Sequence, residues 1–195
     1  IGIGPGDPEH ITLKAVRMMK EVDVIAAPGT DVKETLAYRI AVQAVPEIEQ
    51  KELLPIDMPM TMDKELLLKA HKNGAETIEK VLEDGKSLGF ITLGDTTVYS
   101  TFSYLEKIVK EHGFETVYIS GITSFCAAAA SLGIPLTEWQ EPLHVVPAVH
   151  QLDDKLALDG SYVLMKSGRQ MPKVKEILTK SGRKVNMVEN CGLPD

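Results

Sequence analysis

The sequence is poor in cysteine, in aromatic residues and in long apolar runs. Only Cys126 and Cys191 are cysteines among 195 residues, and aromatic side chains make up 5%. Two cysteines without a metal-ligand spacing exclude a disulfide scaffold and a zinc finger. No apolar stretch approaches the roughly 18 residues of a membrane helix, and no secretory signal opens the chain. We therefore expect a cytoplasmic protein with reduced thiols and no membrane partner.

Positive charge is also scarce. Lys and Arg number 21 against 28 Asp and Glu, which gives a formal net charge of −7 and a pI near 5.3. Such a chain does not attract phosphate backbones over long range, and no basic run compensates, so we expect no nucleic-acid partner. The histidines show neither the i, i+4 spacing nor the Cys neighbours of a metal site, so no metal is predicted.

What the sequence has is a regular alternation of strand and helix signals. Helices are predicted at 33–45, 64–82, 99–111, 123–132, 151–158 and 172–180, with another that starts at Asp7. Strands are predicted at 1–3, 23–27, 87–93, 115–119, 143–146, 161–165 and 184–188, with an edge strand or loop at 53–60. Strands that alternate with helices imply crossover connections and a largely parallel sheet. The predicted fold class is α/β.

We place a domain boundary near the turn at Ser120. Residues 1–119 then form an N-terminal α/β domain, and residues 120–195 a C-terminal α/β domain that is truncated at its end. Ile1 begins in mid-pattern and the last residues leave a strand, so we expect a fragment of a longer protein.

Three polar, glycine-containing loops follow predicted strands. They comprise residues 2–7, 94–101 and 120–124. Because open α/β sheets bind ligands beyond the carboxyl ends of their strands, we expect the three loops to meet at one site.

The first loop invites a dinucleotide site, but its spacing is G-x-G-x-G rather than G-x-G-x-x-G, and Pro5 removes an amide. The alternative is a tight strand-to-helix turn. In the second loop, Asp95 either accepts from a ligand amine or caps the next helix. In the third, Thr123 and Ser124 either receive polar ligand atoms at a helix N-terminus or simply cap that helix.

Taken in order, these loops resemble the motifs of the tetrapyrrole methylase family. Residues 2–8 (GIGPGDP) are similar to its opening motif, Gly94-Asp95 with 98–100 (VYS) to its G-D-P loop, and 120–124 (SGITS) to its P-G-I-T/S-S segment. The segment 163–166 (VLMK) resembles its fourth conserved strand. Within the family, the similarity is strongest to methylases that act on carbon 20 of precorrin-2 or cobalt-factor II in cobalamin synthesis.

The resemblance implies two α/β domains with mixed, largely parallel sheets, a cofactor cleft between them, a homodimer and bound S-adenosylmethionine. The C-terminal domain would form the cofactor side of the cleft and the N-terminal domain the tetrapyrrole side. Cofactor contacts would come from Pro5, Leu93, Gly94, Asp95, Val98, Thr123, Ser124, Met165 and Lys166.

Two positions depart from the family pattern. Thr96 replaces the usual Pro after Gly-Asp, which predicts a less rigid loop. Pro28 stands where the resemblance implies an Asp in the uroporphyrinogen methylases. Methyl transfer from a sulfonium needs mainly positioning, so a modest base suffices, and Tyr99 is our candidate catalytic group. A local basic rim, with Arg17, Arg39, Lys51 and Lys166 as candidates, would meet the substrate carboxylates.

Three other functions stay open at this point. The chain could be a methylase of the same family that acts on uroporphyrinogen III, on another corrin carbon, or on a protein or RNA. It could be a dinucleotide-dependent oxidoreductase. It could also be a non-catalytic module that binds a small ligand or a partner.

Overall fold

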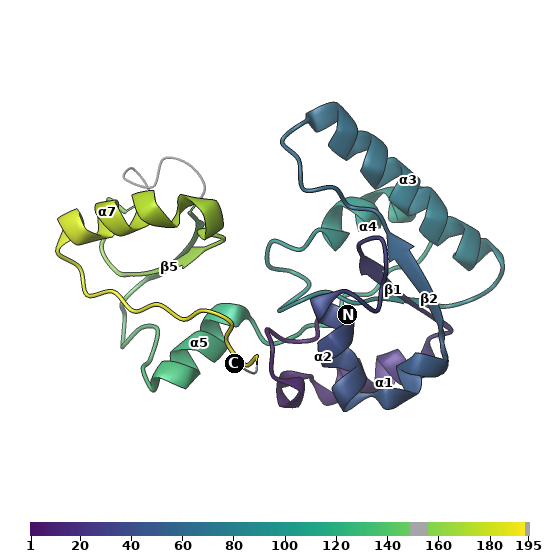
Figure 1. The fold of residues 1–195 in the computed structure, drawn as a ribbon, viewed down its shortest axis with the longest axis horizontal. Helices are drawn as coiled ribbons and strands as arrows, with labels where there is room; N and C mark the ends of the chain where they lie inside the picture. The colour runs from purple at the N-terminus through teal and green to yellow at the C-terminus, as the bar shows by residue number, and fades with distance from the viewer. Residues whose placement is uncertain (149–155, 194–195) are drawn as a thin grey trace. The chain divides into compact units, whose positions relative to one another are not determined.

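The chain divides into two compact units in a computed structural model that describes residues 1–148 and 156–193 (Figure 1). One unit comprises Ile1–Ser124 together with Asn190–Asp195, and the other comprises Phe125–Glu189. The last described residues therefore belong with the first unit. The helix predicted at 151–158 falls largely outside the described residues and stays a prediction, as does the domain boundary between 119 and 120.

The first unit is built on a three-stranded parallel sheet. β1 (Val24–Pro28) lies between β2 (Glu52–Ile56) and β3 (Leu88–Phe90), in the order β2-β1-β3. Figure 1 shows β1 and β2 side by side. β2 lies at the edge and tolerates the exposed Pro55, as the edge-strand prediction required. The parallel α/β fold is confirmed.

The first predicted helix begins later than expected. Asp7 does not start it: the Asp7 carboxylate caps the 3-10 turn η1 (Pro8–His10) by accepting from the Glu9 amide. The helix α1 (Leu13–Glu21) has its own cap, because Thr12 Oγ1 accepts a hydrogen bond from the Ala15 amide at 3.2 Å. Two capping residues close together in sequence thus split one apolar pattern into two elements.

The other helices of the first unit agree with the prediction apart from their starts. They are α2 (Leu36–Ala44), α3 (Lys64–Glu83) and α4 (Phe102–Glu111), and the short η2 (Pro46–Gln50) follows α2. The predicted starts, at 33 for α2 and at 99 for α4, are each three residues too early. Thr35 caps α2, and Tyr99 has a φ of 50°, which no right-handed helix accommodates.

Three predicted strands are wrong. Residues 1–3 form only an isolated bridge between Gly2 and Thr92, and neither 115–119 nor 184–188 forms a strand. In 115–119 only Ile119 takes part in pairing, since its carbonyl accepts from the Gly2 amide. In 184–188, Val185 and Met187 are about half exposed or more, at 49% and 64%. An apolar pattern indicates a strand locally, but a strand also needs a neighbour to pair with.

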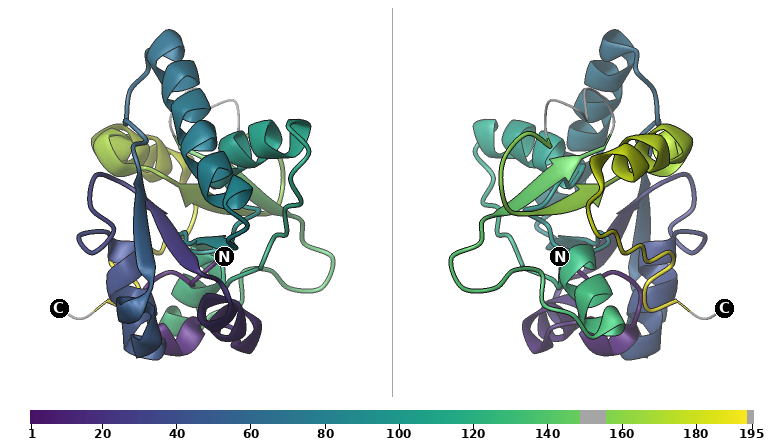
Figure 2. Two further views of the ribbon diagram at one scale, coloured as in Figure 1. Left: turned by 90° about the vertical axis from the view of Figure 1, so that its right-hand side faces the viewer. Right: turned by 90° about the vertical axis from the view of Figure 1, so that its left-hand side faces the viewer.

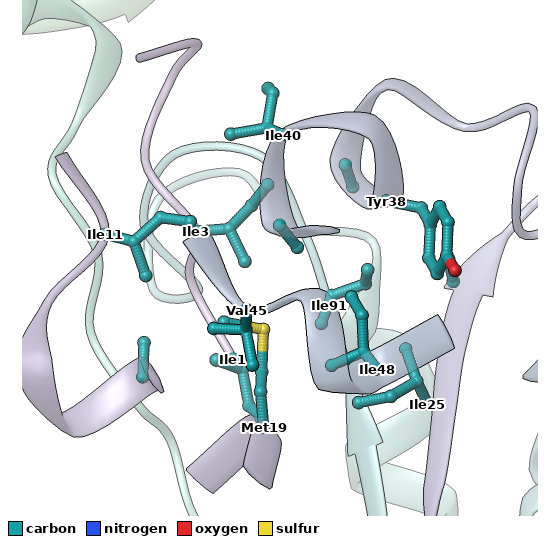
Figure 3. Close-up of a cluster of buried hydrophobic side chains, with 14 of the residues drawn as sticks. Ile1, Ile3, Ile11, Met19, Ile25, Tyr38, Ile40, Val45, Ile48 and Ile91 are labelled. Atoms are coloured by element: carbon teal, nitrogen blue, oxygen red, sulfur yellow. The ribbon is translucent and has the colours of Figure 1, made fainter. Parts of the chain in front are cut away.

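Two apolar clusters fill the first unit. Figure 3 shows the larger one, in which Met19 of α1, Ile25 of β1 and Ile40 of α2 pack with Ile3 and Ile91. The other cluster lies between the sheet and helices α3 and α4 and includes Ile56, Ile78, Phe90 and Leu105. Each face of the sheet is therefore covered, which holds the ends of its strands in place.

The second unit contains a two-stranded parallel sheet. β4 (Leu143–Pro147) pairs with β5 (Ser161–Met165), and α7 (Met171–Ser181), which follows the short η3 (Gly168–Gln170), packs on this pair through Val174 (Figure 2). The small-residue helix α5 (Ser124–Leu132) begins at the junction of the two units. Within the described residues, no helix is long and apolar enough to cross a membrane.

Candidate functional site

The three predicted loops meet in the first unit, as we expected, although only the second of them follows a strand, β3. Gly4 of the first loop pairs with Gly94 of the second through two backbone hydrogen bonds of 2.7 and 3.3 Å. The Gly2 amide donates to the carbonyl of Ile119, directly before the third loop, at 2.8 Å. The first loop is thus hydrogen-bonded both to the second loop and to the residue before the third.

Glycine is required where these loops cross. A Cβ atom placed on Gly2 would lie 2.7 Å from both the Gly121 nitrogen and the Gly94 oxygen. A Cβ atom on Gly121 would meet the same Gly94 oxygen and lie 2.8 Å from the Gly2 carbonyl carbon. Each contact is with backbone, which cannot move aside as a side chain would. The glycines therefore serve close backbone packing in addition to turn formation.

Three amides of the first loop are already in use. Those of Gly2, Ile3 and Gly4 donate to the carbonyls of Ile119, Thr92 and Gly94. Pro5 has no amide to offer. A dinucleotide site needs free amides in this loop to receive the pyrophosphate. The structure therefore gives no support to the dinucleotide alternative.

Asp95 joins the second loop to the third. One carboxylate oxygen, Oδ1, accepts from the Thr97 amide at 2.7 Å and from the Thr97 hydroxyl. The other, Oδ2, accepts from the Gly121 amide at 2.9 Å and from the Ser120 hydroxyl. Asp95 is only 6% exposed. It does not cap α4, and its partners Thr97 and Ser120 carry no signal in the sequence that would pair them with it.

These hydrogen bonds determine the charge state of Asp95. Burial by itself raises the pKa of this carboxyl group, because it disfavours the charged form. The hydrogen bonds from the Ser120 and Thr97 hydroxyls and from the Thr97 and Gly121 amides outweigh burial and bring the pKa to about 2. Asp95 is therefore ionised at neutral pH.

Thr96 does not loosen the second loop, contrary to our expectation. Its side chain is 1% exposed, and its hydroxyl donates to the Ile119 carbonyl at 3.3 Å. The hydroxyl thus links the second loop to the segment before the third loop by a hydrogen bond. A proline at position 96 would instead have restricted the backbone of the second loop itself.

The second loop also presents apolar and aromatic surface. Leu93 is 42% exposed and Tyr99 is 44% exposed, while Val98 is half-buried. Gly94 and Tyr99 both have left-handed backbone, with φ of 70° and 50°. For an aromatic residue this conformation costs on the order of 1 kcal/mol, and such residues gather at functional sites.

Thr123 carries a buried hydroxyl that lacks a partner. Its Oγ1 atom is inaccessible to solvent and makes no hydrogen bond with any described residue. Thr123 directly precedes α5, yet it does not cap that helix through its side chain. A buried hydroxyl without a partner costs roughly 1–3 kcal/mol, so a polar ligand atom here would restore a lost interaction. Ser124, the first residue of α5, is half-buried beside it.

Two predicted cofactor contacts belong to the second unit. Met165 is the last residue of β5 and is half-buried, and Lys166 follows it with an exposed side chain and a φ of 59°. Met165 therefore ends a parallel strand and Lys166 comes directly after it, whereas the motif comparison placed both in a conserved strand. That they act with the loops of the first unit stays a prediction. Pro5, in the first loop, is half-buried.

The predicted basic rim is only partly available. The Lys51 ammonium donates to the carbonyls of Lys20 (2.9 Å) and Val22, at the amino end of the sheet, and so closes the last turn of α1. Arg17 and Arg39 are exposed and pair with Glu21 and Glu34, respectively. Within the described residues, no group of three or more His, Cys, Asp or Glu side chains is arranged to hold a metal ion.

Comparison with known proteins gives one consistent result. The family described as Tetrapyrrole (Corrin/Porphyrin) Methylases matches residues 1–195. A probable cobalt-precorrin-2 C(20)-methyltransferase of Methanocaldococcus jannaschii is 36% identical over 196 residues, which is 100% of this chain and 83% of that protein. A cobalt-precorrin-2 C(20)-methyltransferase of Salmonella typhimurium is 31% identical and covers 93% of this chain and 77% of its own length.

Solved structures show the same architecture. The X-ray structure of a cobalt precorrin-4 methyltransferase superposes with a TM-score of 0.76 at 22% sequence identity. The match covers 100% of this chain and 80% of that one. At this level of identity the match demonstrates a shared fold.

Proposed function

The chain belongs to the tetrapyrrole (corrin/porphyrin) methylases, and we propose that it transfers a methyl group from S-adenosylmethionine to carbon 20 of precorrin-2 or cobalt-factor II. The observation that carries this proposal is the similarity over the whole chain to C(20)-methyltransferases, at 36% identity for the archaeal protein. The product would enter cobalamin synthesis.

The first unit has features that suit an adenosylated ligand. The unpartnered Thr123 hydroxyl would receive a polar atom of the cofactor. The exposed side chain of Leu93 would supply apolar contact for the adenosyl group. Pro5, Gly94, Val98 and Ser124 lie in the same three loops. The cofactor supplies an activated methyl group whose leaving group, a neutral thioether, is already in place.

With the methyl group already activated, the protein's task is alignment and exclusion of water. The loops bring two glycine backbones into direct contact, which leaves little freedom for Leu93 or Thr123 to shift. The carbon at position 20 is enamine-like and hence nucleophilic. Its proton leaves after methyl transfer, and a weak base is enough. We assign Tyr99 to this polar role because it lies exposed on the second loop with a strained backbone.

An acidic protein with a polycarboxylate substrate needs local positive charge. We do not assign Lys51 to this role, because its ammonium group is hydrogen-bonded to the end of α1, at the amino end of the sheet. Arg17, Arg39 and Lys166 remain candidates. The family resemblance further supports a homodimer in the cytoplasm. Sedimentation analysis of the purified protein tests the dimer.

A methyl-transfer assay tests the assignment. The protein is incubated with S-adenosylmethionine and either precorrin-2 or cobalt-factor II, and mass spectrometry maps the new methyl group. We expect one methyl group at carbon 20. A methyl group at another carbon would show that the protein is a methylase of the same family with a different site of methylation. Titration calorimetry with S-adenosylhomocysteine and NAD provides the control, in which only the former should bind.

A further inference from the structure

We propose that Met60 and Met62, in the segment of residues 57–63 between β2 and α3, bind the tetrapyrrole substrate together with Lys33. The two methionines would contact an apolar face of the ring, and the lysine would pair with one of the carboxylates at its edge. This inference rests on the function proposed above, and it names residues outside the cofactor loops that would recognise the substrate of that reaction.

The first step concerns where the segment lies. β2, β1 and β3 are parallel neighbours, so the chain leaves all three at the same edge of the sheet. Residues 57–63 follow β2, residues 29–35 follow β1, and the second loop follows β3. Neighbouring strands lie roughly 5 Å apart, so the ends of β2 and β3 are separated by about 10 Å. A ring of four pyrroles can span that distance, from the second loop to residues 57–63.

The second step concerns the apolar surface of this segment. Met60 is 100% exposed and Met62 is 85% exposed, whereas Met58 packs against the apolar cluster between the sheet and helices α3 and α4. Neighbouring exposed apolar side chains mark a surface that a ligand or partner can cover. The unbranched thioether side chain adapts its shape to what it contacts, which suits the face of a large ring.

Both ends of the segment are fixed. The Gly29 amide donates to the Ile56 carbonyl at 2.8 Å, which joins the start of the segment to the residues that follow β1. At the other end, Asp63 caps α3 by accepting from the amides of Glu65 and Leu66. The backbone that carries the methionines is therefore held in place before the substrate arrives, which lowers the entropic cost of binding.

The third step concerns charge. Lys33 has an exposed side chain in the residues after β1, which is the central strand of the three. It forms no ion pair with any residue that the structure describes, whereas the nearby Arg39 pairs with Glu34 at 2.7 Å. Its ammonium group is therefore available to a substrate carboxylate, at the edge of the sheet where both the second loop and the methionine segment begin.

Steady-state kinetics of methyl transfer, with calorimetry of S-adenosylhomocysteine binding, test the inference. The variants are Met60→Gln, Met62→Gln and Lys33→Gln. Because all three side chains are exposed, the substitutions should change the stability of the fold little. We expect each variant to raise the KM for the tetrapyrrole about 5- to 10-fold, with kcat and S-adenosylhomocysteine binding unchanged. In Lys33→Gln the KM should also depend less on salt concentration than in the wild type.

Trp139→Gln and Lys80→Gln are the controls. Trp139 is a fully exposed apolar residue that precedes the amino end of β4. Lys80 is an exposed lysine in the last turn of α3, far along the helix from residues 57–63. Both variants should keep the wild-type KM for the tetrapyrrole.

Two results would overturn the inference. An unchanged KM for the tetrapyrrole in both methionine variants, or in Lys33→Gln, would show that the substrate does not bind there. A shift in the sedimentation coefficient of the methionine variants would show that the segment contacts a second copy of the chain instead. In either case a wild-type protein that methylates carbon 20 leaves the proposed function intact. A wild type that neither transfers methyl groups nor binds S-adenosylhomocysteine would refute the proposed function, and this inference with it.

Discussion

Replacing Gly121 with alanine tests whether the three loops are held by direct backbone contact. The added Cβ atom would collide with the Gly94 oxygen and lie 2.8 and 2.9 Å from the carbonyl carbon and oxygen of Gly2. Gly121 has no positive φ, so alanine can adopt its backbone conformation without strain. The whole cost therefore comes from lack of space.

The magnitude follows from what would have to move. Inserting a methyl group into a packed interior costs typically about 1–3 kcal/mol when side chains can adjust. Here the neighbouring atoms are backbone atoms of two loops that are hydrogen-bonded to each other. We expect a loss of at least about 3 kcal/mol in the free energy of unfolding, a large part of the roughly 5–15 kcal/mol typical of a domain.

Urea denaturation followed by circular dichroism measures this loss, and Gly113→Ala is the control. A Cβ atom on Gly113 meets nothing within 4 Å, but its φ is 94°. That variant should lose only the conformational cost of a left-handed residue, about 1–2 kcal/mol. If Gly121→Ala were no less stable than Gly113→Ala, the loops would not be in the close contact described. Normal binding of S-adenosylhomocysteine by Gly121→Ala would point the same way.

Three further predictions concern single side chains. The pKa of Asp95 is lowered from 3.8 to about 2, so its carboxylate contributes about 2 kcal/mol of stability above pH 4. This contribution is lost as the pH falls through 2, and the acid denaturation of Asp95→Asn should show no such pH-dependent loss. Tyr99→Phe should lower kcat at least roughly tenfold with little change in the KM for the cofactor, and an unchanged kcat would exclude the hydroxyl from the reaction. Lys51→Met should cost about 1 kcal/mol of stability, because two carbonyls at the end of α1 lose their donor, and should leave the KM for the tetrapyrrole unchanged. A raised KM for the tetrapyrrole in that variant would indicate that Lys51 binds the substrate carboxylates.

Local patterns account for what the sequence alone determined. Apolar runs and capping residues depend on neighbours a few residues away, which is why helix α3 and strands β1 and β5 lie almost where they were predicted. Pro55 indicated an edge strand or a loop for the same reason, and the structure has an edge strand there. The glycine-rich loops and their similarity to one family were also visible in the sequence.

Tertiary structure decided how those loops are joined. Nothing near Asp95 in the sequence indicates that Ser120 and Gly121 are its partners, because they approach it only when the segment that ends at Ile119 pairs with the first loop. The same holds for Lys51, which looked like a substrate ligand until its contact with the end of α1 was seen. Segment 115–119 looked like a strand, yet it lacks the ladder of a neighbouring strand. Hydrogen bonds between residues far apart in the sequence depend on how whole elements pack, and a local sequence pattern does not specify that packing.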